Sequence, residues 1–388
     1  MRLPTNDEKQ AVRDASQAGK PIRVPLNWGC NSRIVLLDPD LNPEGYTYQQ
    51  MLTDPTVPPI MQSRFDEYCG TTLAETCDRT VDLPETWAFS YEYHNVSDGA
   101  YFGAPIQFRD GQVPSVEPYY GIDEVDALLA RDFSRPLENP WIQQCLRFRE
   151  ELQQVAERFT YLGRKGRVLD FTLNFDGPLT IATILFGTDI FLFLLEEPEK
   201  ARELMLYITR ACILRNQALL QLAGQPCKGE WGGIADDSIQ LISTALYEDI
   251  VMPAHELWFS EMSTSTPANR RRSIHLCGDA TRHFPVISEK LGVSSFDTGF
   301  PVDHGALRRT LGPEVFISGG PPTGLLRHST PELCYAETRH ILQSGIMEGG
   351  KFSLREGNNL PPCVPIENLT AVYEACLTYG WYTDQAPA

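Results

Sequence analysis

The second half of the chain alternates short apolar runs with longer segments in which apolar positions recur at helical spacing. This alternation is typical of βαβ units, and it predicts a parallel sheet covered by helices. A proline at 253 predicts a kink or break in one of these helices. The predicted strands are 167–173, 229–234, 272–277, 293–297, 315–318 and 351–354, and the predicted helices are 198–223, 243–262, 281–291, 304–311, 330–344 and 365–379.

The first 150 residues are richer in turn signals and aromatic residues. Strand candidates lie at 86–94 and 100–108, and Asp110-Gly111 predicts the turn of a β-hairpin. With the apolar run 21–27 and one more N-terminal strand, the chain offers about eight strands, enough for a closed barrel. No long linker divides the chain. We therefore predict one domain, 1–388, with an α/β fold: a (β/α)₈ TIM barrel with its core at 151–388 and an elaborated N-terminal part, 1–150, carrying the hairpin.

Charge and composition narrow the classes of function. The net charge of −18 argues against a nucleic-acid partner, because phosphate binding needs clustered Lys and Arg. The densest basic run, Arg270 to Arg272, is interpreted as a solvated entrance to a strand. No apolar stretch reaches the roughly 20 residues that span a bilayer, so we expect no membrane partner. Ten cysteines without an export signal favour the cytoplasm. Glycine-rich phosphate loops are absent, and the oligomeric state is not indicated.

The strongest chemical signal is a His-x-Cys pair. His275 and Cys277 are two apart on a predicted strand, so their side chains share one face, and Gly278-Asp279 ends that strand. In a barrel this places the pair at the C-terminal end, where active sites lie. Cys363 follows the last predicted strand and opens on the same face, and two thiols with one imidazole favour zinc. From the residues alone, core packing is the more common explanation of such a pair, and the spacing by itself does not establish a metal site.

Acidic residues near the same end are candidates for proton handling or for a fourth metal ligand. Asp236 and Asp237 end one predicted strand, Glu230 lies at its start, and Asp297 ends the next strand but one. Adjacent carboxylates raise one another's pKa, which suits a general acid, but the same pair also fits a helix N-cap.

Several segments together resemble the second half of the uroporphyrinogen decarboxylase superfamily. The resemblance covers roughly residues 150 to 380, and the first 150 residues match only loosely. The segments that carry it are Phe175-Asp176-Gly177-Pro178-Leu179-Thr180, His275-Leu276-Cys277-Gly278-Asp279, Phe296-Asp297, Arg308-Arg309-Thr310-Leu311-Gly312, Gly319-Gly320 and Pro365-Ile366-Glu367-Asn368-Leu369.

The resemblance implies one of two kinds of enzyme. The porphyrin decarboxylases carry an early R-Q-A-G-R-Y segment, where this chain has Pro25-Leu26-Asn27-Trp28-Gly29. The zinc- and cobalamin-dependent methyltransferases bind zinc through a His-x-Cys pair and a later cysteine, which His275, Cys277 and Cys363 match. This similarity implies Zn²⁺, a cobalamin supplied by a partner corrinoid protein or as free methylcobalamin, and a small methyl donor or thiol acceptor.

On this interpretation a methyl group moves between the substrate heteroatom and cobalt. The expected catalytic residues are Asp237, Asp297 and Glu230, and the expected cofactor-binding residues are Asp236, Gly319 and Gly320. Two alternatives stay open. One is a metal-free decarboxylase that relies on Arg23, Arg327 and Arg355, and the other is a non-catalytic barrel with structural zinc completed by His304 or His328.

Overall fold

Five parallel strands form the main sheet of the protein. The computed structural model describes residues 2–382, without the side chain of His94. The strand order is β10-β9-β8-β7-β6, so each strand pairs with its neighbour in sequence. These strands match five of the predicted ones, with small shifts at their ends: β6 (Gly232–Ala235), β7 (Arg272–Leu276), β8 (Val293–Thr298), β9 (Phe316–Gly319) and β10 (Phe352–Leu354).

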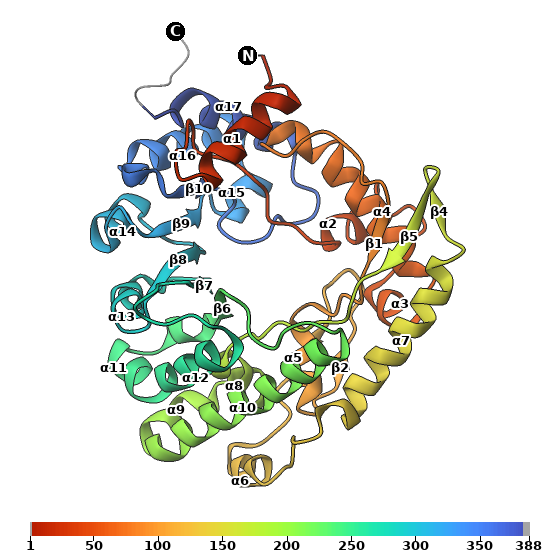
Figure 1. Cartoon of the computed structure of the whole chain (residues 1–388), viewed down its shortest axis with the longest axis vertical. Helices are drawn as coiled ribbons and strands as arrows, with labels where there is room; N and C mark the ends of the chain where they lie inside the picture. Colours follow the sequence, from red (N-terminus) through yellow and green to blue (C-terminus); the bar gives the residue numbers. More distant parts are fainter. Residues whose placement is uncertain (1, 383–388) are drawn as a thin grey trace.

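Helices connect these strands and lie outside them (Figure 1). Prolines at 198 and 331 occupy the first turns of α10 (Pro198–Leu222) and α16 (Pro331–Gln343), where a missing N–H costs nothing. The predicted helix 243–262 is divided into α11 (Thr244–Leu246), a π-helical turn (Tyr247–Val251) and α12 (Met252–Met262), so the irregularity lies next to Pro253. The other helices of this half are α10 (Pro198–Leu222), α13 (Phe284–Lys290), α14 (His304–Leu311), α15 (Thr323–His328), α16 (Pro331–Gln343) and α17 (Ile366–Tyr379).

The predicted strand 167–173 is displaced. The chain forms β5 (Arg164–Val168), which pairs in parallel with β1 (Trp87–Phe89) and antiparallel with β4 (Thr160–Tyr161). The segment that follows is not a strand, because side chains bind its carbonyl groups: Asn216 donates to Leu173 O at 2.8 Å. Backbone groups held in this way are not available to a neighbouring strand.

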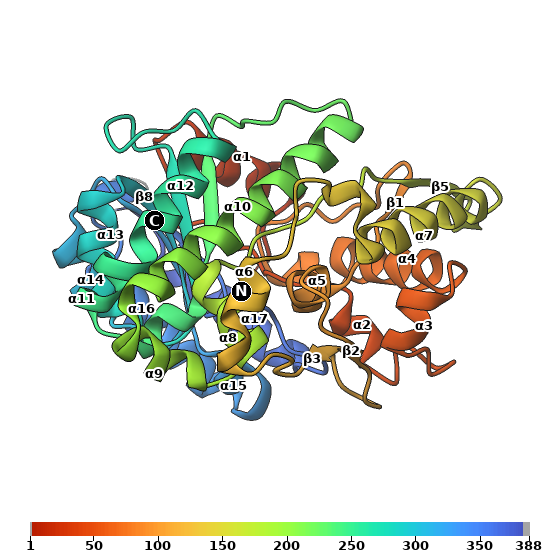
Figure 2. The ribbon, with the colours of Figure 1, turned by 90° about the horizontal axis from the view of Figure 1, so that it is seen from below.

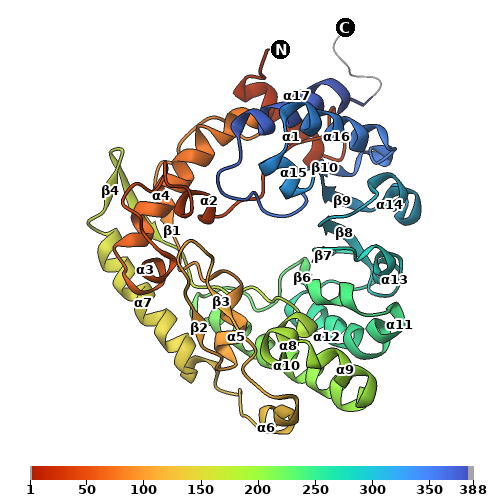
Figure 3. The same ribbon diagram turned by 180° about the vertical axis from the view of Figure 1, so that it is seen from behind.

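Closure of the predicted eight-stranded barrel is not seen. The elements follow one another around a ring (Figures 1 and 3). The run 21–27 contributes a single parallel bridge, Leu26 to Leu354, beside β10. Within residues 2–382 the strand pairs form three separate sheets, so the structure shows an α/β fold with a parallel five-stranded sheet.

The N-terminal half lies to one side of the main sheet (Figure 2). Its short strands β2 (Ile106–Gln107) and β3 (Ser115–Val116) pair antiparallel, and Asp110-Gly111 lies in their connection. The rest of this half is mainly helical: α2 (Arg33–Leu36), α3 (Tyr48–Thr53), α4 (Val57–Gly70), α5 (Ser97–Tyr101), α6 (Val125–Leu129) and α7 (Pro140–Ala156). The predicted strand 100–108 is therefore partly helix, and only its last residues are extended.

The two ends of the chain meet. Helix α1 (Asn6–Gln17) lies beside α17 (Figure 1), and the Lys9 ammonium is 5.9 Å from the ring centre of Tyr373. No single described helix is long and apolar enough to cross a membrane. The pair α8 (Pro178–Phe186) and α9 (Asp189–Glu196) meets the length and composition test only together, with a bend of 117° between them.

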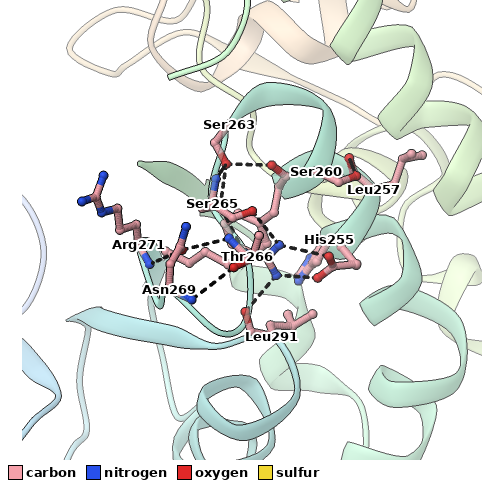
Figure 4. A network of polar contacts seen from close by, with 12 residues as sticks. His255, Leu257, Ser260, Ser263, Ser265, Thr266, Asn269, Arg271 and Leu291 are labelled. Atoms are coloured by element: carbon pink, nitrogen blue, oxygen red, sulfur yellow. Dashed lines mark hydrogen bonds and ion pairs between the residues drawn. The ribbon is translucent and has the colours of Figure 1, made fainter. Parts of the chain in front are cut away.

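The N-terminal end of β7 is fixed by polar contacts, and the interpretation of the arginine run as solvated is wrong for Arg272. Its side chain is 1% exposed and donates to Glu256 Oε2 at 2.5 Å and to Leu291 O at 2.8 Å. Ser263 and Ser265 belong to the same network, which joins the end of α12 to the loop before β7 (Figure 4). The opposite end of β7 carries the candidate site.

Candidate metal centre and its cavity

Three side chains able to bind a metal ion meet at the C-terminal end of the parallel sheet. Asp237 follows β6, His275 lies on β7, and Cys277 follows β7, and one ligand atom from each lies within 4.8 Å of the others. His275 Nε2 is 3.1 Å from Cys277 Sγ. Burial alternates along β7, with Ile274 and Leu276 buried, which confirms that His275 and Cys277 share the other face.

Asp237 is held in this group by the backbone. Its Oδ1 accepts the backbone N–H of Cys277 at 2.7 Å, so the carboxylate is fixed beside the thiol by a bond that does not depend on the thiol itself. Its second oxygen accepts no hydrogen bond from the described residues, and it is free to serve as a ligand. The sequence placed Asp237 at this mouth as a candidate for proton handling or metal binding.

Asp297 lies behind the imidazole rather than beside the thiol. Its Oδ2 is 2.8 Å from His275 Nδ1 and 2.9 Å from Arg355 Nη1. Burial lowers the pKa of His275, but hydrogen bonds to Asp297 and Cys277 outweigh it and raise that pKa to about 10. A carboxylate on the far nitrogen is the usual partner that orients a metal-binding histidine. The predicted role of Asp297 as a proton carrier is therefore less apt than a role in orienting His275.

The cluster opens into a polar cavity of about 640 Å³, a size suited to a small-molecule ligand. His275, Cys277, Asp237 and Asp297 all line it. None of its described lining residues is Phe, Tyr or Trp, so Tyr91, Tyr93, Trp28 and Trp231 do not form its wall. Much of the wall consists of side-chain amides: Asn31, Asn95, Asn174, Asn358 and Asn359.

Asp176 is a lining residue to which sequence reasoning assigned no role. Burial raises its pKa to about 7, with further contributions from Asp98 and Asp237, while Arg215 acts in the opposite direction. Its backbone N–H donates to Asp98 Oδ2 at 3.1 Å, and Asp98 pairs with the buried Arg215 at 2.5 Å. In the sequence, the Phe175-Asp176-Gly177 segment marks Asp176 only through the family resemblance, and no local pattern indicates that its carboxyl is buried.

Cys363 is not brought into the cluster. Its side chain is exposed, its Sγ lies 3.8 Å from Leu37 O, and its φ of 55° places it in the left-handed region. The loop after β10 does reach the cavity, as predicted, but it presents Asn358 and Asn359 there. The sequence located the loop correctly, whereas the direction of one side chain within it depends on backbone angles that spacing does not reveal.

Asp236 does not line the cavity, in contrast to its expected role in cofactor binding. It is fully buried, and its carboxylate accepts hydrogen bonds from Thr180 N at 2.8 Å, Thr180 Oγ1 at 2.7 Å and Leu179 N at 3.2 Å. His255 Nε2 is also 2.9 Å from it. These contacts satisfy N–H groups in the first turn of α8 from a distant part of the chain, whereas Asp236 makes no side-chain cap bond to the helical turn Asp237–Leu241 that follows it.

Glu230 lies at the wrong end of its strand. It precedes β6, its side chain is 82% exposed, and it is 3.4 Å from Arg271. Because the site is at the C-terminal end of the parallel strands, a residue at the N-terminal end is separated from it by the length of β6. The expected catalytic role of Glu230 is therefore corrected to that of a surface ion pair.

Gly319 and Gly320 are packing residues in the described structure. A Cβ at Gly319 would press against Thr298 and His304, and one at Gly320 would collide with the carbonyl of Arg355. Neither glycine lines the cavity, and their expected role in cofactor binding has no counterpart there. Gly319 leaves room for Thr298 of β8 and for His304, and Gly320 lets the end of β9 approach the end of β10 closely.

The donor set fits zinc. One imidazole, one thiol and one carboxylate are all ligands that zinc accepts, and a set of three leaves a position for substrate. Among residues 2–382, His304 and His328 do not join the group, so a closed four-ligand structural site is not formed.

Comparisons with known proteins agree with this architecture. The chain matches the family model described as Uroporphyrinogen decarboxylase (URO-D) over residues 99–379. A solved methyltransferase from Methanosarcina mazei has a similar fold, with a TM-score of 0.61, 18% identity, and coverage of 97% of this chain and 99% of that one.

A B12-independent methionine synthase from Shewanella sp. W3-18-1, solved in complex with selenomethionine, gives a TM-score of 0.36 at 14% identity, covering 60% of this chain and 66% of that one. That similarity is too low to carry an argument. Curated proteins give no match. Because the family model spans well over half of the sequence, the chain belongs to the uroporphyrinogen decarboxylase family.

Proposed function

We propose that this protein is a zinc-dependent methyltransferase, which moves a methyl group between the heteroatom of a small substrate and the cobalt of a corrinoid. The observation that carries the proposal is the meeting of Asp237, His275 and Cys277 at the floor of a polar cavity. The methyltransferase of similar fold agrees with this proposal, but at 18% identity it supports the architecture only.

The residues present would hold zinc through His275 Nε2, Cys277 Sγ and a carboxylate oxygen of Asp237. Cys363, the ligand implied by the family resemblance, is proposed as a further candidate that metal analysis can test. When bound, the ion would supply Lewis acidity that lowers the pKa of a substrate thiol. Asp297 keeps the imidazole oriented by accepting from its Nδ1.

Asp176 is the proposed proton carrier. It lines the cavity, and a carboxyl with a pKa of about 7 can both take up and release a proton near neutrality. When a thiol accepts the methyl group, its proton passes to the Asp176 carboxylate. When an ether or amine donates the methyl group, the protonated carboxyl returns a proton to the demethylated heteroatom.

The charge distribution does not favour a porphyrin-type decarboxylase, which would need several cations to grip substrate carboxylates. Arg23 is 1% exposed and paired with Asp78, and Arg355 is paired with Asp297 and Glu356. Arg327 does not line the cavity. Of the described arginines in the wall, Arg33 alone lacks an ion pair, and one free cation is a poor match for a multiply charged substrate.

The corrinoid is proposed as a second substrate, delivered by a partner corrinoid protein or as free methylcobalamin. The test therefore combines zinc analysis of purified protein with incubation in methylcobalamin and dithiothreitol, followed by visible absorbance. We expect about one zinc per chain, as three ligands would hold, and spectral conversion of the methylcobalamin.

Cys277→Ala is expected to lose both zinc and activity. Cys227→Ala is the matched control, since this thiol lies after α10, 3.8 Å from Gln217 O, and does not line the cavity. Absence of zinc from the wild-type protein, or equal loss in both variants, would contradict the proposal.

A further inference from the structure

A chain of polar contacts runs from the N-terminal segment to the metal cluster. The backbone N–H of Gly29 donates to Glu356 Oε2 at 2.9 Å, and Arg355 Nη2 donates to Glu356 Oε1 at 2.6 Å. Arg355 Nη1 then donates to Asp297 Oδ2 at 2.9 Å, and the same oxygen lies 2.8 Å from His275 Nδ1. Five residues from the segment before α2, β7, β8 and the end of β10 are thus connected by hydrogen bonds.

The geometry around Arg355 restricts it to one position. Glu356, which anchors its guanidinium, is fully buried. A Cβ at Gly29 would collide with the guanidinium, and a Cβ at Gly320 would collide with the carbonyl of the same residue. Two glycines from distant parts of the sequence therefore make room for one arginine. Its fork reaches Asp297 with one nitrogen and Glu356 with the other two.

Arg33 shows what an arginine in this cavity does without such support. It lines the same wall, yet it has no ion pair among the described residues, and its Nε is buried without a hydrogen-bond partner. The two arginines carry the same charge into one cavity, but only Arg355 contacts the carboxylate behind His275. The contrast separates an effect of charge from an effect of position.

We propose that Arg355, fixed by Glu356 and by the space at Gly29 and Gly320, is a positioning residue that holds Asp297 against His275 so that Nε2 faces Cys277. Asp297 without this clamp would be free to turn toward solvent, because it is 30% exposed and Arg355 and His275 are its only described side-chain partners. The imidazole would then lose the contact that sets its orientation. The inference rests on the proposed function only where it names zinc as the ion that His275 binds.

The experiment uses the full chain and two readouts. The first is zinc affinity, measured by competition with a chromophoric chelator. The second is the exchange rate of the His275 Nδ1 proton in metal-free protein at one fixed pH, followed by ¹H–¹⁵N NMR and assigned by its loss in His275→Gln. Urea unfolding of each variant shows that the fold is kept.

For Arg355→Met we expect zinc affinity to fall by about 10- to 100-fold, the usual effect of removing an outer-shell partner, and the Nδ1 proton to exchange faster. Arg355→Lys keeps the charge but cannot donate to Asp297 and Glu356 at once as the planar guanidinium does, so it should show most of the same loss of zinc affinity. Gly29→Ala should act in the same direction, since it displaces the guanidinium without removing any charge. Arg33→Met, which removes an equal charge from the same cavity, should leave both readouts unchanged.

Equal loss of affinity in Arg33→Met and Arg355→Met would overturn the proposal, because charge alone would then explain the effect. So would a Nδ1 proton that exchanges equally fast in the wild type, Arg355→Met and Gly29→Ala. A wild-type protein that binds no zinc would refute the proposed function instead, and the proton exchange in metal-free protein would still test the positioning.

Discussion

Replacing Asp176 by Asn is expected to stabilise the folded chain at neutral pH. The pKa of this carboxyl is raised from 3.8 to about 7, chiefly by burial and then by Asp98 and Asp237. At 1.36 kcal/mol per pKa unit this difference corresponds to at most about 4 kcal/mol. Asp176 is only partly buried and Arg215 offsets some of the repulsion, so we expect roughly 1–3 kcal/mol.

The sign follows from proton linkage. The folded state binds the Asp176 proton more tightly than the unfolded state, so the wild type is relatively most stable below the unfolded pKa near 3.8. Stability decreases as pH rises toward the folded pKa of about 7 and then levels off. Asn carries no charge, so the advantage of Asp176→Asn should be small near pH 4 and reach its full size above pH 7.

Urea unfolding followed by circular dichroism at pH 4.5, 6 and 8 measures this advantage. Asp40→Asn, at an exposed loop position, is the control and should show no such trend. A difference that is independent of pH, or an Asp176→Asn protein less stable than the wild type at pH 8, would refute the reasoning. That result would mean that Arg215 holds the carboxylate in its charged form.

The same carboxyl should shape the pH dependence of activity. With a thiol acceptor, kcat should rise through about pH 7, because the deprotonated form must take up the thiol proton. With an ether or amine donor, kcat should fall through the same pH region. In either case Asp176→Asn should abolish the change in kcat near pH 7. The slope of the profile would therefore also show the direction of transfer.

Three further predictions concern other parts of the structure. Arg272→Met should lower the free energy of unfolding, measured in urea, by about 3–5 kcal/mol because it leaves buried hydrogen-bond acceptors unpaired. The zinc content should stay unchanged, since this network lies at the opposite end of β7. Loss of zinc would contradict this separation. Because the Asp237 carboxylate lies among the ligand atoms and Cys363 Sγ does not, Asp237→Asn should weaken zinc binding more than Cys363→Ala. Zinc affinity is measured by competition with a chelator. A larger loss in Cys363→Ala would place Cys363 in the ligand set and require its loop to rearrange. Asp236→Ala should lower the free energy of unfolding by about 2–4 kcal/mol, because it removes the hydrogen bonds to the first turn of α8 and the contact to His255. The KM for methylcobalamin should not change. A raised KM at unchanged stability would support a role of Asp236 in cofactor binding.

The parallel sheet could be predicted because its strands are apolar, short and separated by helical periodicity. All five strands of the main sheet, and α14 to the residue, correspond to segments predicted from that pattern. Segment 169–177 could not be predicted in the same way. Its backbone is bound by Asn216 and Arg215 of α10, more than forty positions away, and no local pattern reports such contacts.

The positions of site residues could be predicted where two residues share one strand, but not where the conformation of a loop sets the direction of a side chain. His275 and Cys277 meet because alternation along β7 places them on one face. Asp237 joins them because its carboxylate accepts the N–H of Cys277, a contact between the ends of neighbouring strands. Arg355 was considered only as a candidate cation for a decarboxylase, yet its partners are Asp297 and Glu356, and sequence order does not reveal such pairs.

The proposed chemistry is similar for either ligand set. His275, Cys277 and Asp237 supply one imidazole and two anionic donors, and so do His275, Cys277 and Cys363. Two anionic ligands neutralise the charge of a zinc ion, which lowers its acidity and suits a substrate thiolate or a leaving heteroatom better than a hydrolytic water. The difference between the sets lies in softness, because a carboxylate in place of a thiolate lowers the preference for soft ions such as Cd²⁺. The ratio of Cd²⁺ to Zn²⁺ affinity therefore reports which ligand set the protein uses, while the methyl-transfer proposal stands with either.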